Sequence, residues 1–194
     1  MPALSPEIVK KFCGLCNWVH ESWQMFRIFF DKNPKVKLFD YYKFPLYFQY
    51  LALSTKEHSL FQIVKLHDPA VQGKDINLSI DYIISYGGWN PEVTSKLEEL
   101  RRKLEELATF IKPVRNKLYS HFDLATILKG EPIGGFPPGR DEEYFENLQE
   151  FMNIIHGEII GGPHPYSMNS FTDAKLVLEI ISEWTERDKK LTGL

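Results

Sequence analysis

The sequence has few cysteines, no long apolar run and no excess of positive charge. Two cysteines among 194 residues are too few for a disulfide framework. No apolar stretch reaches the roughly 20 residues that a membrane-spanning helix needs, and the first residues include charged side chains where a secretory signal would be apolar. A formal net charge of -3 gives no overall basic character, so any contact with nucleic acid must be local. We expect a cytoplasmic protein that does not contact membranes.

Helical periodicity is what the sequence has in abundance. Residues 1–194, with 43% hydrophobic content, suit one globular domain or a domain with an appended helix pair, and we predict a single domain. Apolar residues recur at helical intervals between breaks rich in glycine or proline. We predict an all-α domain, a mostly antiparallel bundle of five to six helices. The expected elements are a first helix opened by Ser5 and Pro6, a second over about 36–67, a short helix or buried strand over 76–86, a long motif helix over about 90–128, a Gly/Pro loop over 130–139 and a C-terminal helix pair over 141–187.

The two cysteines, His58 and His67 are not predicted to bind a metal. Cys13 and Cys16 lack the second Cys/His pair of a zinc site, so they are expected to be small buried hydrophobes. Neither a metal nor a cofactor is therefore expected. His58 and His67 each stand beside an acidic residue, but consecutive residues point to different faces of a helix and do not make a ligand pair. We expect both histidines at the surface.

Aromatic residues crowd the second predicted helix. Tyr47 and Tyr50 belong to this group, which lacks interleaved Lys and Arg and is therefore predicted to be core rather than a base-stacking surface. The last helix is expected to pack through Val177, Ile181 and Trp184.

The motif helix is predicted to start at Asn90 and Pro91, because Asn caps first-turn amides and Pro at the first position leaves no amide unpaired. One apolar stripe then follows at alternating steps of four and three residues. Its members are Val93, Leu97, Leu100, Leu104, Leu107, Ile111, Val114 and Leu118. His121 is the next position on the stripe, so its imidazole is expected to point into the bundle or toward a partner. Pro113 removes one backbone hydrogen bond and is expected to kink the helix.

Arg115 lies next to the apolar stripe. On a regular helix it would be roughly 120° around and about 9 Å along the axis from His121. A long guanidinium stem could close that gap around one ligand, and so could a second copy of the helix across a two-fold axis. The residues leave an alternative open, in which His121 is hydrogen-bonded in the core and Arg115 pairs with a surface carboxylate.

Arg115 and Asn116, followed by four residues and then His121, resemble the Arg-polar-x(4)-His signature of the HEPN superfamily. The layout also resembles the AbiU-type branch, which is associated with abortive phage infection and toxin–antitoxin loci. In that layout two long aromatic-rich helices precede the motif helix and two helices follow it.

The resemblance implies a metal-independent endoribonuclease that acts as a homodimer, with the two motif helices facing each other around one composite cleft. It implies RNA as the substrate, a role as a toxin or antiviral-defence effector, and an antitoxin such as a nucleotidyltransferase as a candidate partner. Some toxins of the superfamily carry a Tyr just after the motif His that such a partner modifies. Here Tyr119 precedes His121 instead, so a structural role for Tyr119 stays open beside a supporting one.

The residue types suit cleavage of RNA by its own 2′-hydroxyl, which needs a proton acceptor, a proton donor and a group that holds the phosphate. His121 would move the proton near neutral pH, and Arg115 would hold the phosphate oxygens with its planar fork of donors. Asn116 would orient the phosphate or the imidazole, while Lys112 and Lys117 add local positive charge. The alternative is a non-catalytic HEPN-like module that binds nucleotide, RNA or a partner protein.

Overall fold

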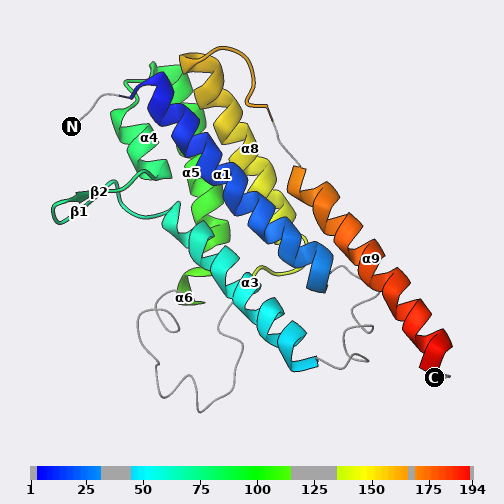
Figure 1. The fold of residues 1–194 in the computed structure, drawn as a ribbon. Coiled ribbons are helices and arrows are strands. Elements are labelled where there is room, and N and C mark those ends of the chain that lie inside the picture. The colour runs from blue at the N-terminus through cyan, green and yellow to red at the C-terminus, as the bar shows by residue number, and fades with distance from the viewer. Residues whose placement is uncertain (1–3, 32–44, 115–134, 166–168, 193–194) are drawn as a thin grey trace. The chain divides into compact units, whose positions relative to one another are not determined.

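The computed structural model describes residues 4–31, 45–114, 135–165 and 169–192. Helices dominate these residues, and one short hairpin is the exception, so the predicted all-α bundle is confirmed (Figure 1). None of the helices in the described ranges is long and apolar enough to cross a membrane. The elements are α1 (Pro6–Phe26), the π-helix η1 (Arg27–Asp31), α3 (Pro45–Lys65), β1 (Val71–Gln72), β2 (Asp75–Ile76), α4 (Ile80–Tyr86), α5 (Pro91–Ala108), α6 (Lys112–Val114), α8 (Arg140–Ile159) and α9 (Asn169–Thr192).

The chain divides into two compact units. The first unit comprises Met1–Asn17 and Leu60–Pro165, and the second comprises Trp18–Ser59 and Tyr166–Leu194. The prediction of one domain over residues 1–194 remains a prediction.

The antiparallel pair of α5 and α8 forms the core of the first unit (Figure 1). Arg140 in the first turn of α8 binds Glu106 in the last turn of α5, which fixes the opposite directions of the two helices. The predicted apolar stripe faces inward as far as it is described, and its buried members are Val93, Leu97, Leu100, Leu104, Leu107 and Ile111. The α8 residues buried with them are Tyr144, Phe145, Leu148, Phe151, Met152 and Ile155.

The start of α1 completes this core. Ser5 accepts a hydrogen bond from the Ile8 amide at 3.3 Å and so caps α1, as the sequence predicts. The ring of Phe12 lies 6.0 Å from that of Phe151 in α8. Cys13 and Cys16 are buried free thiols, which confirms that they act as small hydrophobes.

Two predicted core surfaces of the second unit are instead exposed. Tyr47 and Tyr50 of α3 are 63% and 69% exposed, and Val177 and Trp184 of α9 are 43% and 54% exposed. Ala174 is buried among the α9 residues whose side chains are described, and α9 contacts η1. The prediction was wrong because helical spacing shows which residues share a face, while burial depends on what packs against that face.

The long motif helix predicted over 90–128 is interrupted. Asn90 caps α5 as expected, since its Oδ1 accepts the Val93 amide at 2.9 Å. α5 nevertheless ends at Ala108, with Thr109 as its C-cap, and the chain turns before α6 begins. Pro113 explains the break, because its ring would clash with the carbonyl of Thr109 in a continuous helix and is tolerated in the first turn of a new one. The rest of the predicted motif helix lies outside the described residues.

Truncating a buried side chain between α5 and α8 should destabilise the protein. Leu104 is fully buried, so Leu104→Ala is expected to cost about 3 kcal/mol of unfolding free energy, through lost burial and the cavity left behind. The neighbouring Lys103→Ala, on the outer face, should cost less than about 0.5 kcal/mol. Urea denaturation of both variants measures this, and equal losses would contradict the placement of the core.

Candidate functional site

The predicted catalytic residues lie outside the described residues, whereas the chain just before them is described. Arg115, Asn116, Lys117, Tyr119 and His121 belong to the part of the sequence that the structure leaves undescribed. Lys112 is the described member of the predicted site, and it is the half-buried first residue of α6. The motif segment, residues 115–134, is flanked by described residues on both sides, α6 before it and Gly135 after it.

A hydrogen bond joins the chain before the motif segment to the chain after it. The chain passes from α5 through α6 to Val114, and the next described residue is Gly135. The Gly135 amide donates a hydrogen bond to the Phe110 carbonyl at 3.3 Å. Gly135, the first described residue after the motif segment, therefore lies beside the last turn of α5.

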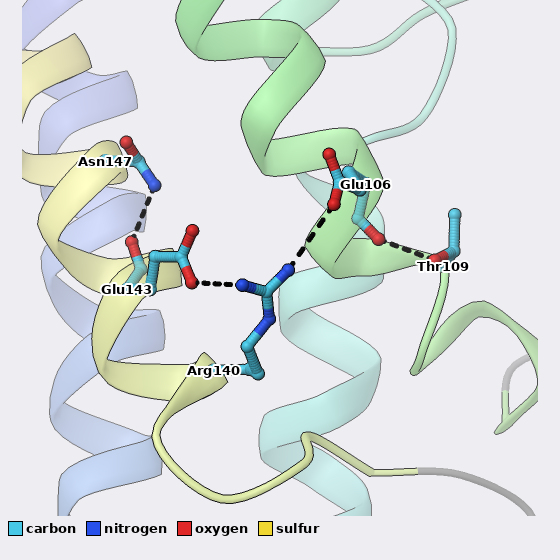
Figure 2. A network of polar contacts seen from close by, with 5 residues as sticks. All are labelled: Glu106, Thr109, Arg140, Glu143 and Asn147. Carbon is cyan, nitrogen blue, oxygen red and sulfur yellow. Dashed lines mark hydrogen bonds and ion pairs between the residues drawn. The ribbon is translucent and has the colours of Figure 1, made fainter.

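Arg140 fixes the first turn of α8 at the same place. Its Nη1 binds Glu143 Oε2 at 2.6 Å within α8, and its Nη2 reaches Glu106 Oε1 of α5 at 3.4 Å (Figure 2). Asn147 donates to the Glu143 carbonyl and Thr109 to the Glu106 carbonyl, as the dashed lines in Figure 2 show. Because the side chains of Arg140 and both glutamates are substantially exposed, we assign this network an orienting role more than a large contribution to stability.

A half-buried histidine, His67, follows α3 and contacts α8. His67 Nε2 is 2.9 Å from the Tyr144 hydroxyl, and the ring of Phe136 lies 5.5 Å from that of Tyr144. Burial and, to a smaller extent, the positive charge of Lys112 together lower the pKa of His67 from 6.5 to about 3. His67 is thus a neutral hydrogen-bonding group at neutral pH, within electrostatic reach of Lys112.

The sequence prediction placed His67 at the surface, which is wrong. It relied on the adjacent Asp68 and overlooked the helical spacing. His67 follows the buried Ile63 and Val64 by four and three residues, the spacing that puts side chains on one face. That spacing was the available signal for an interior histidine.

The segment after α8 carries a second polar cluster in the first unit. Asn17 Nδ2 lies 2.9 Å from His164 Nε2, and the His164 amide donates to Asn153 Oδ1 at 3.1 Å. The ring of His156 is 5.3 Å from that of His164, and burial, together with His156, lowers the pKa of His164. These contacts hold residues 161–165 against α8 and α1. No group of three or more His, Cys, Asp or Glu side chains in the described ranges is placed to hold a metal ion.

Acid should destabilise the protein through two half-buried histidines, His67 and His20. Burial lowers the pKa of His67 to about 3 and that of His20 to about 4, from 6.5. Below pH 6.5 the unfolded chain therefore binds protons that the folded chain does not. Stability is complete above this pH and falls as the pH drops toward the folded values, by up to about 1.4 kcal/mol per pH unit for each histidine.

Urea midpoints between about pH 7 and pH 4.5 test this expectation. His67→Gln should flatten the pH dependence, because glutamine can keep a hydrogen bond to Tyr144 without titrating. The exposed His58 provides the control variant His58→Gln, which should leave the slope unchanged. An unchanged slope in His67→Gln would contradict the neutral state of His67.

Comparisons with known proteins identify the family. No curated protein and no solved structure matches the chain. The family model of AbiU2, a HEPN family, matches residues 6–170. The matched range begins with α1, contains α3 to α8 and the whole motif segment, and reaches the start of α9. The chain belongs to the AbiU2 family of HEPN domains.

Proposed function

We propose that this protein is a metal-independent endoribonuclease of the HEPN type, with Arg115, Asn116 and His121 as its catalytic residues. The observation that carries the proposal is the AbiU2 family match over residues 6–170, because the Arg-polar-x(4)-His motif lies inside that range. The hydrogen bond between Phe110 and Gly135 supports it, because it brings the chain before the motif segment and the chain after it together beside the end of α5.

In the proposed reaction the RNA 2′-oxygen attacks the adjacent phosphorus. A new 2′-O–P bond forms and the P–O5′ bond breaks, which gives a 2′,3′-cyclic phosphate and a free 5′-hydroxyl. A base removes the 2′-hydroxyl proton and an acid protonates the 5′-oxygen. His121 is assigned to proton transfer, and Arg115 to the non-bridging phosphate oxygens, where negative charge builds in the transition state. Asn116 orients the phosphate or the imidazole.

Two copies of the chain would supply the acid and the base together. We infer a homodimer in which two motif segments face one composite cleft, with Lys112 and Lys117 adding local positive charge for RNA. Tyr119 supports this cleft. We further propose a cytoplasmic toxin or phage-defence effector, restrained by an antitoxin such as a nucleotidyltransferase.

Cleavage of total RNA and of tRNA in EDTA tests the proposal. Wild-type protein should cut, whereas His121→Ala and Arg115→Ala, shown by circular dichroism to be folded, should lose at least about a hundredfold in rate. The matched controls are His58→Ala and Arg102→Ala, since both side chains are exposed. These should retain wild-type rates.

Two results would contradict the nuclease. Wild-type protein that does not cut RNA in EDTA would overturn it, and so would cleavage by His121→Ala at the wild-type rate. In either case a non-catalytic HEPN-like module that binds nucleotide, RNA or a partner protein becomes the better account of the fold.

A further inference from the structure

α9, drawn in orange to red in Figure 1, carries apolar residues on two sides. One side packs within the second unit, where α9 contacts η1, and includes the buried Ala174 and the half-buried Leu178 and Ile181. The other side is 43% to 58% exposed at its large apolar residues, which are Leu176, Val177, Ile180 and Trp184. A second apolar face that stays this exposed is typical of an interaction surface.

The exposed side contains a stripe with a symmetric spacing. Five exposed residues follow one another at steps of three, four, four and three positions, and they are Asp173, Leu176, Ile180, Trp184 and Arg187. At about 100° per residue, these positions lie within about 80° of one another around the helix. We call them the α9 stripe. It begins with an acid, ends with a base and is centred on Ile180.

The α9 stripe is complementary to itself in one arrangement. In an antiparallel pair of α9 helices centred on Ile180, residues equally far from the centre on either side face each other. Leu176 then meets the partner's Trp184, and Asp173 meets the partner's Arg187. Both contacts occur twice, because contacts across a two-fold axis are reciprocal. A parallel pair would instead bring like charges together at both ends, which is unfavourable.

We propose that the α9 stripe is an interface at which two copies of this chain pair antiparallel about Ile180. Its apolar residues supply the attraction, and Trp184 belongs to the residue types that most often anchor an interface. Trp184 also has an interaction within its own chain, and its 54% exposure leaves surface for a second copy. The Asp173–Arg187 pairs set direction and register more than affinity, because exposed ion pairs are weak.

Oxidative cross-linking of the full chain tests the pairing. Ile180→Cys puts two introduced thiols at the two-fold axis, so oxidation should give a disulfide-linked dimer on a non-reducing gel. The matched control is Leu176→Cys, an equally exposed position of the stripe whose counterpart is the partner's Trp184. It should give at least about tenfold less dimer, because its two copies would lie roughly 12 Å apart along the helices, too far for a disulfide.

Two cross-linking results would overturn the pairing. One is equal dimer yield from Ile180→Cys and Leu176→Cys, and the other is no dimer from Ile180→Cys. Wild-type protein gives the background, since Cys13 and Cys16 are buried.

Charge reversal in the Ile180→Cys background tests the register. Asp173→Arg puts like charges at both ends of the stripe and should lower the yield of cross-linked dimer about threefold. Adding Arg187→Asp restores opposite charges and should restore the yield. The two positions lie about 21 Å apart within one helix, so this rescue requires two copies.

A double charge variant whose yield stays as low as that of Asp173→Arg would overturn the antiparallel register. The cross-linking yields report on the α9 stripe alone, independently of RNA cleavage and of the cleft proposed for the motif segments. Failure of the nuclease would therefore leave this inference untouched, and failure of the pairing would leave the nuclease untouched.

Discussion

Burial of the apolar stripe between α5 and α8 is the constraint on which the first unit depends. Leu97, Leu104 and Ile111 are fully buried, and each such side chain contributes roughly 1.5–3 kcal/mol relative to an exposed one. The antiparallel packing places the end of α5 beside the start of α8. The Arg140 network, the Phe110–Gly135 hydrogen bond and the His67–Tyr144 pair all lie at that end. The packing of this core therefore positions the residues that flank the motif segment, at the end of α5 and the start of α8.

The sequence predicted those parts of the fold that follow from local chemistry. The cap at Asn90, the inward stripe of α5 and the buried thiols of α1 each depend on residue type and spacing within one helix. Prediction of burial failed where it depended on which other segment packs against a helix face. Tyr50 and Trp184 lie on apolar helical faces that nothing in the sequence distinguishes from core faces, yet both are exposed. Pro113 was expected to bend one helix, and the structure instead separates two.

The candidate site also contains residues that the sequence predicts and contacts that it does not. The motif residues could be found from sequence because a short spacing identifies them, and the AbiU2 family match covers that spacing. The hydrogen bond between His67 and Tyr144 could not be predicted, because the two residues are far apart in sequence and meet only through the packing of α8.

We propose that Arg115, Asn116 and His121 promote cleavage of RNA by the 2′-hydroxyl of the RNA itself. Analysis of the RNA ends left by wild-type protein in the presence of EDTA tests this most directly. The account predicts 2′,3′-cyclic phosphate and 5′-hydroxyl ends, because the 2′-oxygen of the RNA attacks the adjacent phosphorus and the 5′-oxygen leaves. Ends with a 5′-phosphate and a 3′-hydroxyl would contradict it, because those products require attack by water on the phosphorus.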